Sequence, residues 1–150
     1  MKKGKVSYDT SYVLNPDLKK EDLFSRCLKW FKDTSANNKK YIRSSDDKSG
    51  EVIGDGLFKI TTSSTGNYYW IRFVIDIKIH NGGYEFSAHS FYEKPVESGI
   101  SNEYSKIEYR WWDYRQGKPW SAEDETLFKG IVANETSLMA SLQQQMIGKR

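Results

Sequence analysis

The chain contains very little cysteine, histidine and proline. Its 150 residues include one cysteine, Cys27, so an internal disulfide is excluded, together with any fold that depends on a disulfide framework. One cysteine and two histidines also supply too few ligands for a usual structural zinc site. No apolar run approaches the roughly 20 residues that a membrane-spanning helix needs. We therefore expect no metal, no cofactor and no membrane span.

The composition is that of one folded domain, which we expect to cover residues 1–150. Charged residues make up 29% of the chain and hydrophobic residues 37%, which is typical of a globular rather than a disordered protein. The net charge of +3 is small. Much of it comes from the two chain ends, with Lys2, Lys3, Lys5, Lys149 and Arg150. Charged ends are usually solvated, so this excess is weak evidence for a nucleic-acid partner.

The N-terminus leaves two expectations for the compartment. Met1-Lys2-Lys3 resembles the start of a signal peptide, but no apolar segment follows it. The protein is then either cytoplasmic or the mature form of an exported protein with an added methionine.

The clearest pattern is a long β-hairpin in the middle of the chain. From residue 71 to residue 80, large apolar side chains recur with a period of two, which predicts a strand with one buried face. These side chains are Ile71, Phe73, Ile75, Ile77 and Ile79. Asn81-Gly82-Gly83 then predicts a tight turn, for which we take Gly82-Gly83 as the two-residue loop.

This loop fixes how the two strands of the hairpin pair. On the apolar face it pairs Ile79 with Phe86, Ile77 with Ala88, Ile75 with Ser90 and Phe73 with Tyr92. On the polar face it pairs His80 with Glu85, Asp76 with His89 and Arg72 with Glu93. Apolar residues meet apolar residues and opposite charges meet, as cross-strand pairing favours. A half-buried antiparallel sheet is therefore predicted as the centre of the fold.

Two amphipathic helices and further short strands are predicted around this hairpin. The first helix begins at Asp17 or near Lys20, and its apolar stripe is Leu23, Cys27, Trp30 and Phe31, widened by Phe24 and Leu28. The second runs from Ser121 to about Ile147 with Leu127, Phe128, Ile131, Leu138 and Leu142. Strands are predicted at 6–10, 41–44, 51–63 and 107–112, and a loop at 94–105.

The order of these elements is β-α-β-β-β-β-(β)-α, which gives an α+β fold with both helices on one face of the sheet. Gly54 and Gly56 lie inside the predicted strand at 51–63. They predict either a bulge or a place where a helix packs close to the backbone.

Catalytic residues are hard to find in this sequence. An Asp76–His89 pair could orient a general base, with Ser87 as the nearest hydroxyl in the predicted pairing. Cross-strand ion pairs on a solvated sheet face explain the same residues. We keep a hydrolase that uses Asp76 and His89 as an alternative and assign no catalytic residue.

Aromatic residues are the better candidates for a binding surface. Neighbouring rings in Tyr68-Tyr69-Trp70 and Trp111-Trp112-Asp113-Tyr114 point to opposite faces of their strands, so both faces cannot be equally buried. Exposed rings are typical of contacts with sugars, peptides or single-stranded nucleic acid. The candidate ligand-binding residues are Tyr69, Arg110, Trp112, Tyr114 and Trp120.

The segment from Lys20 to Gly56 resembles a bacterial family of unknown function with a TATA-binding-protein-like (TBP-like) fold, found mostly in exported proteins of gut-type anaerobes. The resemblance rests on Leu23-Phe24, Trp30-Phe31, Asp47-Lys48-Ser49-Gly50, Ile53-Gly54-Asp55-Gly56 and the Asn81-Gly82-Gly83-Tyr84 turn. It extends from about Val6 to Tyr92. It implies a curved antiparallel sheet with helices on one side, and a periplasmic or exported location. It supplies no catalytic residues.

From these patterns we expect a non-enzymatic binding module of the cell envelope that uses the uncovered sheet face and the aromatic cluster. The expected partner is a glycan, a peptide or a protein. A nucleic-acid-binding protein remains an alternative, although the small net charge disfavours it. A fold by itself does not decide between this binding module and a nucleic-acid-binding protein.

Overall fold

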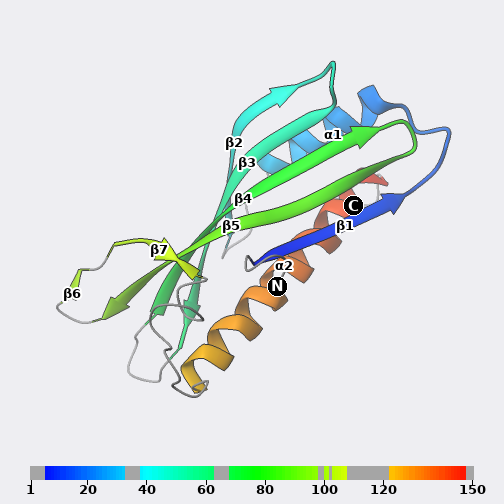
Figure 1. Ribbon diagram of the computed structural model, residues 1–150. Helices are drawn as coiled ribbons and strands as arrows, with labels where there is room; N and C mark the ends of the chain where they lie inside the picture. The colour runs from blue at the N-terminus through cyan, green and yellow to red at the C-terminus, as the bar shows by residue number, and fades with distance from the viewer. Residues whose placement is uncertain are drawn as a thin grey trace.

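An antiparallel sheet of five long strands, covered on one face by two helices, makes up the fold (Figure 1). The computed structural model describes residues 6–32, 38–62, 68–97, 100–101, 103–107 and 122–147. The strands are β1 (Ser7–Val13), β2 (Asn38–Asp46), β3 (Glu51–Thr61), β4 (Tyr68–His80), β5 (Gly83–Glu97), β6 (Ile100–Ser101) and β7 (Ser105–Lys106), and the helices are α1 (Lys20–Lys32) and α2 (Ala122–Met146). The long strands lie in the order β1-β5-β4-β3-β2. The predicted α+β class is confirmed.

The face of the sheet that is turned toward the helices carries the core, and we call it the covered face. In β4 the buried and the more exposed residues alternate, as the period of two predicts. All the predicted apolar residues of this strand are buried, namely Ile71, Phe73, Ile75, Ile77 and Ile79. The helices add Leu23, Cys27, Trp30, Phe31, Leu127, Ile131, Leu138, Leu142 and Met146.

The register of the hairpin differs from the predicted one by two residues. Asn81 and Gly82 form the two-residue loop, and Gly83 already pairs with His80. Gly82 adopts a φ of +83°, and a Cβ at Gly83 would overlap the carbonyl oxygen of Tyr12 on β1. Because the shift is even, Phe86 and Ala88 stay on the covered face.

The shift overturns every predicted cross-strand pair near the turn. Ile79 pairs with Tyr84, Ile77 with Phe86, Ile75 with Ala88, Lys78 with Glu85 and Asp76 with Ser87. The prediction chose Gly-Gly as the loop, although Asn-Gly is the stronger hairpin signal. The side chain of Asn81 also fixes this choice, because its Oδ1 accepts a hydrogen bond of 2.9 Å from the backbone nitrogen of Lys20, at the start of α1.

A β-bulge in β5 changes which of its residues face the helices. Ser90 and Phe91 together oppose the single residue Phe73, and Ser90 has a φ of 57°, in the left-handed region. Beyond the bulge Phe91 is buried, whereas Tyr92 lies on the opposite face and pairs with Arg72. The predicted pairs of Phe73 with Tyr92 and of Arg72 with Glu93 are therefore wrong.

The two glycines of β3 mark places where rings pack against the backbone. A Cβ at Gly54 would overlap the Phe31 ring of α1, and one at Gly56 would overlap the Phe73 ring of β4. The predicted close packing of a helix is correct at Gly54, whereas at Gly56 the ring comes from a neighbouring strand instead. The bulge of this region lies in β2 instead, where the pairing shifts between Ile42 and Ser44.

Segment 94–105, predicted to be a loop, is largely strand. β5 continues to Glu97, and β6 and β7 pair with this second half of β5. Tyr92 and Lys94 lie two residues apart beyond the bulge, and this period of two was a strand signal that the prediction missed. Most of the strand predicted at 107–112 lies outside the described residues, and Ile107 is buried in the core.

The two helices are joined to each other by side chains. The indole nitrogen of Trp30 donates a hydrogen bond of 2.9 Å to the hydroxyl of Ser141 on α2. Arg26 donates to the carbonyl oxygen of Met146, one of the carbonyls that a helix end leaves without an intrahelical partner. These contacts help to hold both helices against one face, so neither helix covers the other face of the sheet.

Candidate functional site: the open face of the sheet

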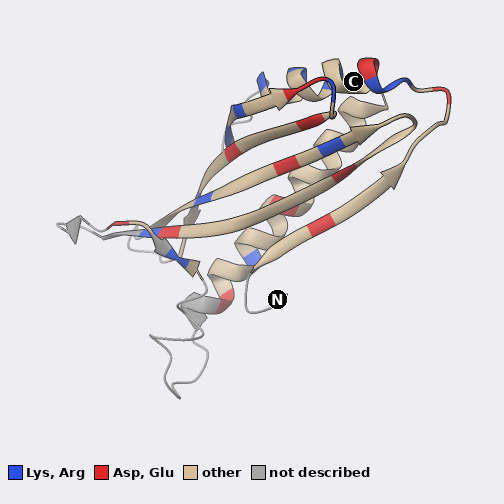
Figure 2. Ribbon diagram, turned by 45° about the horizontal axis from the view of Figure 1, so that its top comes forward, with Lys and Arg blue, Asp and Glu red and all other residues tan. Residues whose placement is uncertain are grey.

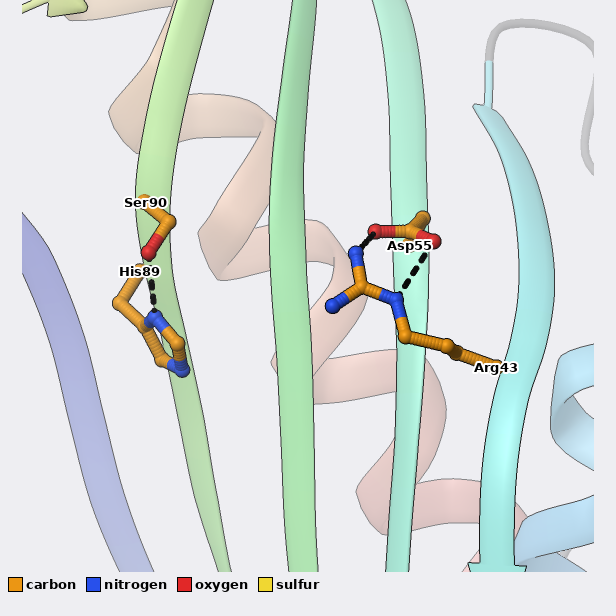
Figure 3. Close-up of polar contacts among 4 residues, drawn as sticks. All are labelled: Arg43, Asp55, His89 and Ser90. Carbon is orange, nitrogen blue, oxygen red and sulfur yellow. Dashed lines mark hydrogen bonds and ion pairs between the residues drawn. The ribbon is translucent and has the colours of Figure 1, made fainter.

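The face of the sheet that points away from the helices is polar, and we call it the open face. The strands in Figure 2 carry charged residues along their length, and in Figure 3 the helices lie behind the strands whose polar side chains are drawn. Successive residues of a strand point to opposite faces, so the cross-strand pairs arrange the open face into rows that run across the strands.

The structure places one of the five predicted ligand-binding residues. Tyr69 is only 6% exposed and belongs to the core, so its ring offers no face to a ligand. The other four, Arg110, Trp112, Tyr114 and Trp120, lie outside the described residues, and their role stays a prediction. On either side of Tyr69, Tyr68 and Trp70 lie half-exposed on the open face.

Aromatic and basic residues gather where the open face is farthest from the hairpin turn. The basic–aromatic surface consists of Lys59, Tyr68, Trp70, Arg72, Tyr92, Lys94 and Tyr104. None of these seven residues was among the predicted ligand-binding residues, although Trp70-x-Arg72 and Tyr92-x-Lys94 place a ring and a cation on the same face by the period of two.

The cations of this surface lie over its rings. The guanidinium carbon of Arg72 is 5.1 Å from the ring centre of Tyr92 and 4.6 Å from that of Tyr104. The ammonium group of Lys94 is 5.0 Å from Tyr104, and that of Lys59 is 4.9 Å from Tyr68. Such contacts stabilise the positions of the cations by about 0.5–1 kcal/mol each at exposed sites.

Two rows across the strands contain these cations. One row is Lys106, Tyr92, Arg72, Leu57 and Lys39, on β7, β5, β4, β3 and β2. The other is Lys94, Trp70 and Lys59, on β5, β4 and β3. A basic residue thus occurs on every second strand, with a ring or a leucine between.

The turn end of the open face has the opposite charge. Next to the row of His80, Gly83 and Val13 at the turn, the following two rows contain Asp9, Ser11, Asp46, Glu51, Asp76, Lys78 and Glu85 among their members. A hollow of about 580 Å³ lies here between β1, β5 and β4, lined in part by Asp9, Asp76 and Glu85. Burial and then the neighbouring carboxyl group of Glu51 raise the pKa of Asp76 to about 6, while Lys78 lowers it.

The polar pairs on the middle of the open face do not form the expected catalytic arrangement. Asp76 pairs with Ser87, and His89 pairs with Val74. The Nδ1 atom of His89 lies 2.8 Å from the hydroxyl oxygen of Ser90, within hydrogen-bond distance (Figure 3). The predicted facing pair of Asp76 and His89 is therefore wrong.

Figure 3 also shows the contact between Arg43 of β2 and Asp55 of β3, an ion pair that the two side chains form on the same open face. It joins the edge strand to its neighbour and balances the charge of the middle of the sheet. Both side chains are partly solvated, so the pair contributes little to stability.

The single cysteine, Cys27, is buried. Burial raises the pKa of the Cys27 thiol to about 12, which leaves it unreactive as a nucleophile. Within the described ranges, no three histidine, cysteine or carboxylate side chains are grouped closely enough to hold a metal ion.

In the described part of the chain, neither helix has the length and apolar character that crossing a membrane requires.

Similarity to known proteins agrees with this architecture. The chain aligns with two solved structures over its whole length. One is a TBP-like protein from Parabacteroides distasonis, with 13% identity, 97% of that chain covered and a TM-score of 0.79. The other is a DUF4468 family protein from Bacteroides ovatus, with 15% identity, 90% covered and a TM-score of 0.74. At these identities the likeness shows the fold alone.

Sequence similarity identifies the family. No curated protein matches the chain. A family model matches residues 10–94, which include α1, β2, β3 and β4 with most of β1 and β5, and thus most of the hairpin and of the open face. The chain therefore belongs to the family described as "Domain of unknown function (DUF4468) with TBP-like fold".

Proposed function

We propose that this protein is a non-enzymatic binding module of the cell envelope, and that it holds its ligand on the basic–aromatic surface of the open face. The observation that carries this proposal is the set of half-buried rings on a sheet face that the helices leave uncovered. Rings supply a large contact area at a small cost in side-chain entropy, which makes them frequent at binding surfaces.

The location in the envelope is supported by the family resemblance, which implies exported proteins, and by related structures from Parabacteroides and Bacteroides. Fractionation of the native cells, with detection of the protein by antibody, tests this part of the proposal. The protein is expected in the envelope fraction, and a purely cytoplasmic signal would contradict it.

The binding role is tested by a thermal-shift screen of the purified protein against glycans, peptides and oligonucleotides. A ligand present at 100 times its Kd adds about 2.7 kcal/mol to the free energy of unfolding, which such a screen detects. Trp70→Ala is expected to abolish the shift. Tyr41→Ala is the matched control, because Tyr41 is an exposed ring on the same face but outside the surface.

The same screen separates the binding module from the hydrolase alternative. Each ligand that gives a shift is incubated with the protein and analysed by mass spectrometry for cleavage. We expect the ligand to remain intact. Cleavage that disappears in His89→Ala would overturn the proposal in favour of the hydrolase.

A further inference from the structure

We infer that the ligand of the basic–aromatic surface is an acidic glycan in which every second sugar carries a carboxylate. This inference rests on the proposed function and specifies its ligand. Three features carry it: the separation of charge on the open face, the spacing of the cations and their fixed positions.

Positive charge is concentrated at one end of the open face. The two rows of the basic–aromatic end hold Lys39, Lys59, Arg72, Lys94 and Lys106 and no acidic residue. The second and third rows from the turn hold Asp9, Asp46, Glu51, Asp76 and Glu85 against one cation, Lys78. An anionic ligand is therefore attracted to the first end and repelled by the second.

Two of the cations, Arg72 and Lys94, are available to a ligand. Arg72 and Lys94 form contacts with rings and make no ion pair with another described residue. Because Arg72 lies over the rings of both Tyr92 and Tyr104, its guanidinium group is held in place before a ligand arrives. A preorganised cation loses less entropy when it binds a carboxylate.

The spacing of the cations matches a disaccharide repeat. Neighbouring strands lie about 4.8 Å apart, so cations on every second strand are about 10 Å apart. This is about the length of one disaccharide unit. A glycan that runs across the strands would place a carboxylate beside each cation. The sugar between Lys59 and Lys94 would then lie over Trp70, whose ring centre is 6.1 Å from that of Tyr68 in a T-shaped arrangement.

A nucleic-acid strand fits this arrangement less well. It carries a phosphate on every nucleotide, one per about 3.4 Å of duplex axis for each strand, so its charges are more closely spaced than the cations of one row. A polyanion that ran along the strands would also reach the acidic rows about 13 Å beyond Arg72, at Asp76. The surface therefore favours a short ligand that crosses the strands.

The test is isothermal titration of the full chain with four probes of known composition. These are a hexasaccharide of alternating uronic acid and N-acetylhexosamine, a neutral N-acetylhexosamine hexasaccharide, an oligothymidylate and a polyglutamate peptide. We expect the alternating hexasaccharide to bind at least ten times more tightly than each of the others. Arg72→Gln is expected to weaken it at least tenfold. Lys78→Gln, on the same strand and face but at the acidic end, should change the Kd less than twofold.

The possible outcomes distinguish a failure of the proposed ligand from a failure of the proposed binding function. Equal affinity for the acidic and the neutral hexasaccharide, both lost in Trp70→Ala, would overturn the acidic glycan and leave the binding module standing. Tighter binding of the oligothymidylate or polyglutamate would also overturn the glycan. If no probe binds here and the screen gives no shift, the proposed function fails as well. Circular dichroism of each variant shows that a loss of binding is not a loss of folding.

Discussion

On its covered face, β4 presents Ile71, Phe73 and Ile75 to the helices, whereas on its open face the same strand presents Trp70, Arg72 and Asp76. The first set is held by packing on every side, so shape and volume decide which residue fits. The second set has solvent or other open-face side chains around it, so folding constrains it weakly. The open face is therefore the part of the sheet on which binding residues can be changed without loss of the fold.

The largest expected effect tests the covered face. Phe73 stacks on Phe91 with ring centres 5.1 Å apart, lies edge-on to Phe58 and covers Gly56. We expect Phe73→Ala to lower the free energy of unfolding by about 3–5 kcal/mol, because it leaves a cavity. Urea unfolding measures this. Val74→Ala, the next residue on the open face, should cost about 1 kcal/mol or less; equal losses would contradict the distinction between the faces.

The second expected effect depends on pH. Glu135 of α2 is fully buried, and neither of its carboxyl oxygens has a hydrogen-bond partner among the described residues. Burial raises its pKa from 4.5 to about 9, and its charge acts on Tyr8 of β1. The folded protein keeps this proton while the unfolded chain releases it above pH 4.5. Stability from this group is therefore full below pH 4.5 and lost as the pH rises toward 9.

Urea unfolding of Glu135→Gln at pH 5, 6.5 and 8 checks this dependence. The amide does not titrate, so the free energy of unfolding of the wild type should fall relative to that of the variant, by up to about 1.4 kcal/mol per pH unit. Parallel curves for the two proteins would contradict a buried, protonated Glu135.

Asp76 provides the same measurement on the open face, with a smaller effect. Its pKa is raised from 3.8 to about 6, so its contribution is full below pH 3.8 and is lost as the pH rises to about 6. Solvent screens this partly exposed group. We therefore expect the free energy of unfolding of the wild type, relative to that of Asp76→Asn, to fall by well under 1 kcal/mol in total between pH 3.8 and about pH 6. An effect as large as that of Glu135→Gln would mean that the hollow excludes water.

The smallest expected effect concerns the ion pair between Arg43 and Asp55. Asp55→Asn should change the free energy of unfolding by less than about 1 kcal/mol, because exposed pairs contribute little. The measurement is repeated in 1 M salt, where screening should remove most of the difference. A large loss that persists in salt would show that β2 depends on this pair for its position.

The covered face could be predicted from the sequence, because a period of two in β4 and the helical spacing in α1 depend only on which residues are apolar. The cross-strand pairing could not be predicted with the same certainty. A shift of two residues keeps the apolar pattern, so only the loop at Asn81 and its contact with Lys20 distinguish the two registers. That contact joins residues 61 positions apart, which no local pattern reports.

The sequence predicted what kind of surface forms the candidate site, but not which residues form it. Exposed rings were expected on the open sheet face, but Tyr69 is buried, and the rings and cations that gather there were not predicted as ligand-binding residues. For Tyr92 and Lys94 the reason is the bulge at Ser90. Without it, Tyr92 would be expected to face the helices, and the predicted pairing of Arg72 with Glu93 would cancel the charge that the surface now exposes.

The bulge also has a consequence for how this surface can evolve. Deletion of Ser90 alone would turn every later residue of β5 over, which would bring Tyr92 and Lys94 to the helices and Glu93 to the solvent. One lost codon would thus remove a cation and add an anion where the ligand is proposed to bind. Relatives with one residue fewer at this position are expected to have lost the ligand while keeping the fold.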